Sequence, residues 1–582
     1  MLSTSLKRKA RIDSGLNKSI IILVVLAFGS FLILFFYAPL SKIFQYAFSE
    51  GNQVTFDYFI STITNPLNLK FLMFTFVQAL LSMIICLILG IPASYFFAKY
   101  NFKGKNLLLN LMTIPFVLPA IVVLLGFIVT YGESGWFNSI WYSLTGSHTP
   151  LIQIFGTFEG ILIAHVFYNL SVIIRMTIPA WKSIDSQQIN VAKSLGASNL
   201  RIFTKIIIPQ IINYIISASL LVFIYTFNSF AIVLYLGEIK FQTLEVRIYK
   251  LMKASLDFNG GATLALIQLF LNTIIIVLYL LFESKTRQMA EGKESIFQGE
   301  KIIFTKSNWR KNLKLLAIIM FIVSLVIFTF SPIIAIIIES FQPYTEGVSP
   351  FWGYQQLFSN DYLPLLNNSP LRMLLNTLLF ATLTTIITLI LSVLLVFVLR
   401  NRYQSLKKYK KSPIENFVSY IIILPMATSS ITLAIGMFLF FNSTAIYRNL
   451  VWIFIVLSHV LISIPFATRS ILSSYNRIDI EMLNVASTLG ASRLRIFRKI
   501  ELPHIYRGII VGGIFSFAIS LGEFGATNFL VRGEYGTLSI GISKLIETQT
   551  LQLPATMASI LVIITVICFL VIQKLGEIEL KV

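Results

Sequence analysis

Long apolar stretches recur along the whole chain, and they restrict the fold more than any other feature of the sequence. They lie near residues 20–41, 71–98, 107–130, 159–180, 207–236, 262–282, 314–339, 373–399, 416–441, 449–472, 506–530 and 555–578. Each is long enough to cross a bilayer, and because the bilayer core cannot hydrate exposed backbone, each is most simply a helix. The pattern predicts an all-α integral membrane protein with about 12 transmembrane helices, about six in each half.

The composition agrees with lipid as the main solvent and excludes several other classes of protein. Hydrophobic residues make up 56% of the chain and charged residues only 12%. The net charge of +21 would favour a nucleic-acid partner in a soluble protein, but here Lys and Arg fall in short segments between the apolar stretches. Cys86 and Cys568 lack metal-ligand spacing, and the sequence holds no phosphate-binding loop and no HExxH motif. Neither a metal site nor an enzyme is indicated.

The basic residues predict the orientation of the chain in the membrane. A Lys/Arg cluster precedes residue 20, and the first apolar stretch is too long for a signal peptide, so we expect an uncleaved first helix and a cytoplasmic N-terminus. The segments 131–158 and 342–370, predicted outside, contain no Lys or Arg. Four basic residues would nevertheless lie outside, on an amphipathic helix at the outer surface: Lys240, Arg247, Lys250 and Lys253.

These assignments divide the chain into four parts. We expect a cytoplasmic tail at 1–18, a first half at 19–283, a cytoplasmic linker at 284–312 and a second half at 313–582. Because each half has an even number of spans, both termini are predicted in the cytoplasm.

One segment is repeated between the halves. Residues 184–209 align with residues 478–503 without a gap, and more than half of the positions are identical. The same offset pairs His165 with His459 and Arg175 with Arg469, and the motif from Pro115 to Gly126 has the spacing of the motif from Pro425 to Gly436. The halves therefore form a parallel repeat in which both copies of the strong segment face the cytoplasm.

The repeated segment reads as a cytoplasmic helix, a tight turn and a second helix that enters the membrane. Gly196 and Gly490 permit the backbone angles of such a turn, and Ser198 and Ser492 can cap the next helix. The sequence thus predicts an exposed projection on the cytoplasmic side of each half, and two related projections suit a partner that is itself a symmetric pair.

A Gly followed by Ile at ten residues, Leu or Ile at twelve and Pro at thirteen resembles the EAA loop of bacterial ABC importer permeases, and the match occurs twice. The resemblance implies two type I (MetI-like) repeats of six helices, two copies of an ATPase subunit that binds ATP and Mg²⁺, an extracytoplasmic binding protein, and no cofactor on this chain. It assigns ATPase coupling to two sets of residues. These are Asn190, Val191, Ala192, Leu195, Gly196, Ala197, Ser198 and Pro209, and Asn484, Val485, Ala486, Leu489, Gly490, Ala491, Ser492 and Pro503.

The loops depart from the family pattern at their first two positions. Asn190 and Asn484 stand where the motif has Glu, and Val191 and Val485 stand where it has its first Ala. The departure puts in question any salt bridge that the motif Glu makes.

Over nearly its whole length the chain resembles the fused two-half permeases for thiamine or ferric iron. The segments 131–136, 160–169 and 227–250 look like the thiamine permease, whereas 520–538 also resembles iron-type members. Thiamine or its phosphates are therefore the favoured substrate and ferric iron the alternative. An ion-coupled secondary transporter fits less well, since it needs no cytoplasmic projection in each half.

Candidate substrate-path residues are those that differ between the halves. Glu523 has no acidic counterpart in the first half, where the corresponding region surrounds Asn228, and Tyr131 and Trp136 could stack on a thiazolium. A hydrogen-bonded structural role for Glu523 and an interfacial aromatic belt are equally open. His165 and His459 occur in both halves, which favours packing between helices, and Arg175 and Arg469 can snorkel to the cytoplasmic interface.

Overall fold

The computed structural model describes residues 26–50, 53–184, 186–290, 300–302, 309–343, 347–406, 425, 427–546, 548 and 551–580. Nearly all regular structure in this part of the chain is helical, and 11 helical stretches in it are long and apolar enough to cross a membrane. The prediction of an all-α integral membrane protein is confirmed. Many large apolar side chains point outward from these helices, as lipid-facing surfaces require: Met73, Ile88, Phe270 and Met320 are each more than half exposed.

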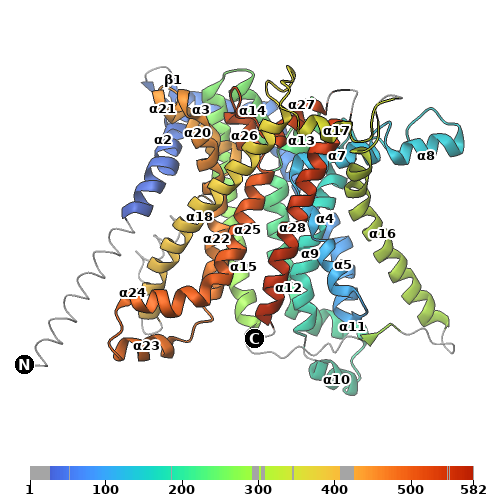
Figure 1. Ribbon diagram of the computed structural model, residues 1–582. Coiled ribbons are helices and arrows are strands. Elements are labelled where there is room, and N and C mark those ends of the chain that lie inside the picture. Colours follow the sequence, from blue (N-terminus) through green and yellow to red (C-terminus); the bar gives the residue numbers. More distant parts are fainter. Residues whose placement is uncertain are drawn as a thin grey trace, which may run out of the picture. The chain divides into compact units, whose positions relative to one another are not determined.

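The chain packs into two compact units, which are described separately. The first unit comprises Ala47–Phe358 and Ile542–Ile563, and the second comprises the described residues of 1–46, Ser359–Gly541 and 564–580. Figure 1 labels the elements and colours them along the sequence.

The first unit contains most helices of the first half, together with two helices from the start of the second half. They are α3 (Asp57–Thr64), α4 (Pro66–Lys99), α5 (Lys105–Leu111), α6 (Ile114–Val117), α7 (Ala120–Tyr131), α8 (Trp136–Thr145), α9 (Phe158–Lys182), α10 (Ser186–Ser194), α11 (Asn199–Ile202), η2 (Phe203–Ile207), α12 (Ile208–Phe227), α13 (Ala231–Leu236), α14 (Leu244–Lys253), α15 (Phe258–Ala290), α16 (Trp309–Glu339) and α17 (Trp352–Leu357). Two small ladders accompany them. β1 (Ser49–Glu50) pairs antiparallel with β2 (Gln53–Val54), and β3 (Tyr100–Asn101) pairs in parallel with β4 (Glu300–Lys301).

The second unit contains η1 (Ile33–Tyr37), most of α2 (Ala38–Ala47), α18 (Pro370–Leu406), α20 (Ser430–Phe441), α21 (Ala445–Asn449), α22 (Val451–Tyr475), α23 (Ile480–Thr488), α24 (Arg493–Ile496), η3 (Phe497–Glu501), α25 (Leu502–Gly522) and α26 (Gly525–Leu530). Helices α27 (Leu538–Leu545) and α28 (Gln552–Leu580) contribute residues to both units.

The packing of the long helices follows from their sequences. Asn65 caps α4 by accepting a hydrogen bond from the Leu67 backbone N–H, and Pro66 occupies the first helical position, where no backbone donor is needed. Helix α4 then packs along α9 and α12, where Cys86 and Ile173 are fully buried in one apolar cluster. Buried small residues such as Ala93 let these helices approach closely, as is usual in membranes.

The first helix of each half packs with helices of the other half. In the first unit α16 lies against α7, and a Cβ added to Gly126 would meet the Pro332 carbonyl oxygen at 2.9 Å. In the second unit the first described helix lies against α20, and a Cβ added to Gly436 would meet Pro39 at 3.2 Å. The compact units therefore differ from the sequence halves by an exchange of first helices, and the two glycines that share a motif spacing sit at matching contacts.

Three apolar stretches that were expected to be single helices are interrupted. The stretch 107–130 is split into α5, α6 and α7, with Pro119 as the N-cap of α7. The stretches 207–236 and 506–530 break after α12 and α25 and continue as the short helices α13 and α26. Average hydropathy could not reveal these breaks because each interruption is short and lies between strongly apolar helices. Of the predicted stretch 416–441, residues 416–424 and 426 lie outside the described residues, and α20 covers its second part.

Candidate functional site

The first copy of the repeated segment folds as predicted into helix α10, a tight turn and helix α11. Gly196 has a φ of +76°, in the left-handed region that favours glycine. The Ala197 N–H donates to the Ala192 carbonyl at 2.9 Å, and the Gly196 N–H donates to the Lys193 carbonyl at 2.9 Å. This pair of bonds satisfies the last carbonyls of α10 and is the hydrogen-bond pattern of a Schellman cap.

The second copy has the same turn, bond for bond. Gly490 has a φ of +80°. The Ala491 N–H donates to the Ala486 carbonyl at 3.0 Å, and the Gly490 N–H donates to the Ser487 carbonyl at 3.0 Å. The sequence repeat is therefore a repeat of backbone geometry. Figure 1 shows α10 at the end of the first unit opposite α14, and α23 at the end of the second unit opposite α21.

Each projection presents an apolar ridge to its surroundings. Val191 on α10 and Leu195, which directly follows this helix, are four residues apart and are 58% and 81% exposed. Val485 on α23 and its C-cap Leu489 match them at 57% and 81%. Each segment therefore exposes large apolar side chains although its composition is polar, and the predicted contact with an ATPase stays a prediction. Asn190 and Asn484, which replace the motif Glu, are also exposed.

The residues around the turns complete the two helices. The Ser198 hydroxyl accepts from the Arg201 N–H at 3.3 Å, which is the predicted cap of α11. Pro209 and Pro503 lie at the start of α12 and α25, as expected. Sequence reasoning missed the π-helical turns η2 and η3, which precede these prolines in both halves. Asp185 lies outside the described residues.

The paired histidines connect helices, as their presence in both halves predicted. His165 lies 2.8 Å from the Ser229 hydroxyl and 3.4 Å from that of Ser82. His459 lies 2.7 Å from the Ser520 hydroxyl, and its Nε2 lies 3.3 Å from the Glu523 carboxylate. At the offset of the repeat Glu523 corresponds to Ser229, so the same histidine position faces a hydroxyl in one half and a carboxylate in the other.

Glu523 lies at the break between α25 and α26. Its carboxylate accepts from the Ala526 N–H at 2.9 Å and from the Thr527 N–H at 3.0 Å, and its side chain is only 6% exposed. A carboxylate at a helix N-terminus is favoured by the unpaired amides and by the helix dipole. These contacts describe a structural cap, and a role of Glu523 in the substrate path stays a prediction.

Asn228 lies at the corresponding break between α12 and α13, and it belongs to a buried polar network. Its amide oxygen accepts from Gln268 Nε2 at 2.9 Å and from Asn272 Nδ2 at 2.8 Å. Gln268 Nε2 also donates to the carboxylate of Glu245. Sequence reasoning singled out Asn228 and missed the other three. The amides within the predicted span 262–282 were a usable signal, since polar groups inside a membrane protein are costly and often functional.

The aromatic candidates lie elsewhere in the first unit. Tyr131 ends α7, is 8% exposed and hydrogen-bonds with Ser331 at 3.1 Å. Its ring stacks on Phe137 with a centroid distance of 5.2 Å. Trp136 begins α8 and is half-buried. The contacts described for these residues do not join them to Asn228, so their role in binding also stays a prediction.

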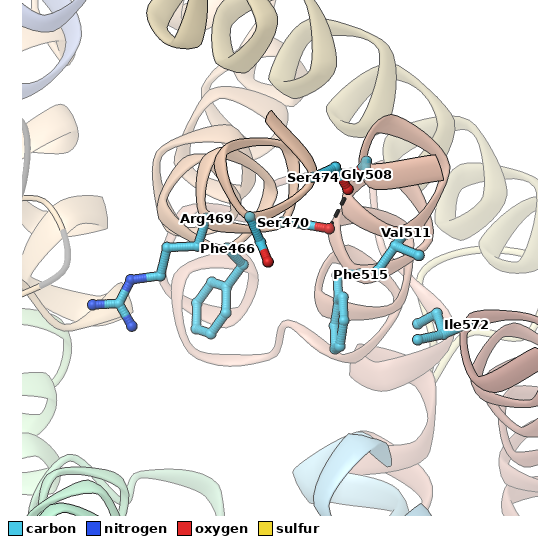
Figure 2. Close-up of a pocket in the computed structure, with 9 residues that line it drawn as sticks. Phe466, Arg469, Ser470, Ser474, Gly508, Val511, Phe515 and Ile572 are labelled. Atoms are coloured by element: carbon cyan, nitrogen blue, oxygen red, sulfur yellow. Dashed lines mark hydrogen bonds between the residues drawn. The ribbon is translucent and has the colours of Figure 1, made fainter. Parts of the chain in front are cut away.

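A cavity of about 370 Å³ lies between α22 and α25 in the second unit. It is lined by Phe466, Arg469, Ser470, Ser473, Ser474, Gly508, Val511, Phe515 and Ile572. Figure 2 shows the Phe466 and Phe515 rings pointing to one side of their helices, whereas the Arg469 side chain extends away from them. The Ser470 hydroxyl donates to the Gly508 carbonyl at 3.1 Å, which holds the two helices together. In the first half Arg175 instead donates to Asn110 and Thr113.

The amphipathic helix predicted around Lys250 is α14, most of whose residues are buried, and its location at the outer surface stays a prediction. Partial desolvation and the nearby charge of Lys544 together lower the pKa of Lys253 to about 8. Among the described residues, three or more His, Cys, Asp and Glu side chains do not gather anywhere as a metal site.

Comparison with known proteins adds independent observations. Residues 90–288 and 405–577 each match the family described as the binding-protein-dependent transport system inner membrane component. The thiamine transport system permease protein ThiP of Haemophilus influenzae is 27% identical over 541 residues, which cover 93% of each chain. ThiP of Escherichia coli is 25% identical over 503 residues, covering 86% of this chain and 88% of that protein. PhnU of Salmonella typhi, provisionally assigned to 2-aminoethylphosphonate transport, is 26% identical over 252 residues, covering 43% of this chain and 87% of PhnU.

Proposed function

Because the chain belongs to the family of binding-protein-dependent transport system inner membrane components, of which it carries two copies, we propose that it is the fused membrane channel of an ATP-driven importer for thiamine. The observation that carries this proposal is the pair of cytoplasmic projections. Two identical Schellman turns hold two matched apolar ridges, Val191 with Leu195 and Val485 with Leu489. Two equal surfaces fit two copies of one ATPase subunit.

In this proposal energy and specificity come from partner subunits. ATP and Mg²⁺ bind to the ATPase pair, and a binding protein delivers the substrate to the opposite side of the membrane. ATP binding draws the two projections together and rocks the halves between inward-open and outward-open states. This chain supplies the path and binds no cofactor. The projections, the Lys/Arg-rich segments and both termini lie in the cytoplasm.

Thiamine is favoured over other substrates by the relatives. Both proteins that align along nearly the whole chain are named for thiamine transport, and PhnU aligns with one half only. None of these three is named for iron, which was the alternative substrate. The proposed ligand is therefore an organic cation that carries a quaternary ring nitrogen.

The test is reconstitution of the chain in proteoliposomes with the ATPase and the binding protein encoded beside it. We expect ATP-dependent accumulation of thiamine, and a competition series with ferric iron and 2-aminoethylphosphonate identifies the preferred substrate. Accumulation of ferric iron without thiamine would replace the substrate. Uptake driven by an ion gradient in the absence of ATPase would instead make the chain a secondary transporter.

A further inference from the structure

The structure assigns to Asn228, Glu245, Gln268 and Asn272, here called the Asn228 network, the role of a polar site for the transported cation. This inference rests on the proposed function and names residues for it. The four residues come from the end of α12, the first turn of α14 and the middle of α15. All lie in the first unit. They are joined by the hydrogen bonds described above, in which Gln268 bridges Asn228 and Glu245.

The network belongs to one half only. At the offset of the repeat, Asn228 and Glu245 correspond to Gly522 and Ser539. Because Thr263 and Thr556 make the same bond to a backbone carbonyl, α15 aligns with α28 so that Gln268 and Asn272 correspond to two further residues, Leu561 and Thr565.

The second half builds the same helices without the carboxylate and the amides. The fold therefore does not require the network. Polar groups inside a membrane protein are costly, so the network lowers stability without being needed for folding. A feature that costs stability and occurs once in a duplicated protein points to the substrate.

Two atoms in the network lack protein partners. Gln268 Oε1 and Asn272 Oδ1 are buried and accept no hydrogen bond among the described residues. Gln268 and Asn272 are each 1% exposed. Buried amide oxygens in this position cost free energy unless a donor reaches them. The unfilled positions are acceptors, so the missing group is a donor.

The charges around the network favour a cation. Glu245 is 1% exposed, so its carboxylate acts in a region of low dielectric constant, where a charge has a long reach. Helix α12 ends at Phe227, and the carbonyl end of a helix carries partial negative charge. A carboxylate, a helix C-terminus and two free amide oxygens together suit an organic cation that carries amino N–H groups.

Access to the network runs through Asn228. This residue is half-buried, whereas the other three are buried, and it sits where the helix is interrupted between α12 and α13. Interrupted helices line substrate sites in many transporters because irregular backbone is tolerated only where it faces protein or a polar path. Asn228 is thus the residue that the substrate contacts first. The carboxylate of Glu245, which is more deeply buried, supplies the electrostatic attraction for the cation.

The test compares three variants in the complete complex with loaded binding protein. Glu245→Gln removes the charge at constant shape, and the double variant Gln268→Leu with Asn272→Thr installs the residues of the second half. We expect each to raise the thiamine concentration for half-maximal uptake by roughly 10- to 100-fold, with unchanged ATPase activity in the absence of substrate. The control is Asn368→Ser, at a buried amide of the second unit whose nitrogen donates to the Glu534 carbonyl and whose oxygen accepts from the Ser369 N–H, and it should leave uptake unchanged.

A second readout separates recognition from a structural role. Oxythiamine keeps the thiazolium but lacks the amino group, so the wild-type complex should take it up less well than thiamine. The binding protein is the same in both arms, so the double variant should lose only the part of this discrimination that the channel makes and should fall to the discrimination of the binding protein itself. Unchanged thiamine uptake in Glu245→Gln, or equal losses of uptake, substrate-free ATPase activity and complex yield, would overturn the inference. Failure of the wild-type chain to take up thiamine would overturn the proposed function instead.

Discussion

The glycines at the two repeated turns, Gly196 and Gly490, offer the sharpest test of the proposed coupling. A Cβ added to Gly196 or Gly490 would meet nothing within 4 Å, so Ala at these positions causes no clash. The cost comes from the backbone alone, because φ values of +76° and +80° are left-handed. For an L-residue this conformation costs about 1–2 kcal/mol. Each Gly→Ala change therefore lowers the population of the native turn by a factor of about 5 to 30 relative to competing geometries.

The expected result is a loss of coupling without a loss of the membrane fold. Gly196→Ala and Gly490→Ala should each reduce the stimulation of ATPase activity by loaded binding protein severalfold. The double variant should lose more, since the two turns lie in different units and their costs of about 1–2 kcal/mol each add. Val at both positions should abolish stimulation, because a β-branched residue tolerates left-handed backbone least. Membrane insertion and yield should match the wild type.

A matched control lies in the same protein. Gly104 precedes α5 with a φ of +86°, and a Cβ there would also meet nothing within 4 Å. Gly104→Ala therefore carries the same backbone cost outside the projections and should leave ATPase stimulation near the wild-type value. Asn tolerates left-handed backbone, so Gly196→Asn should retain most of the stimulation. The reasoning fails if Gly104→Ala is as harmful as Gly196→Ala, or if the double Val variant is stimulated normally.

Three further predictions concern packing, a buried carboxylate and a perturbed lysine. Gly126→Leu and Gly436→Leu should lower the melting temperature in detergent. Cβ atoms at these positions would meet Pro332 at 2.9 Å and Pro39 at 3.2 Å, respectively. Gly29→Leu is the control, because a Cβ there would meet nothing within 4 Å, and it should leave the melting temperature unchanged. Glu523→Gln should destabilise the protein by about 1–3 kcal/mol in denaturant titration, because it weakens both the cap of α26 and the bond to His459. Glu523→Ser installs the residue that the first half has at this position, and it tests whether the site can be repacked. Lys253→Met should raise the melting temperature at pH 7. Because the pKa of Lys253 is lowered to about 8 in the folded protein, the unfolded chain binds more protons than the folded one above that pH. Wild-type stability therefore rises with pH, and the difference in melting temperature between the variant and the wild type should shrink. A difference that stays constant with pH would refute this.

The sequence predicts the fold class and the geometry of the two repeated turns because both depend on local signals. Apolar length identifies spans, and a glycine between two short helices, repeated at one offset, identifies a turn. The left-handed angles at Gly196 and Gly490 confirm this prediction. Interruptions such as the one at Asn228 do not show in average hydropathy, because they are short and lie within a long apolar stretch.

Exchange of the first helices could not be predicted either, although one clue was present. The motif spacing that pairs Gly126 with Gly436 shows that both glycines matter, but not which helix approaches them. The contacts with Pro332 and Pro39 join segments that are far apart in the chain, and only packing reveals them. The same limit applies to Glu245, whose partners come from a different helix.

The two halves are most alike at the repeated turns and differ most at the helix breaks. On the turns, exposure and hydrogen bonds repeat nearly value for value, as for Leu195 and Leu489 at 81% each. At the helix breaks the halves diverge in opposite directions: the second half has Glu523 where the first has Ser229, and the first half has Glu245 where the second has Ser539. Each half thus buries one carboxylate near its break, but only that of Glu245 is bonded to an amide with an unfilled acceptor. Because the Glu523 carboxylate is occupied by backbone donors and His459, exchange of the two acids between halves should not preserve uptake even though it preserves net charge.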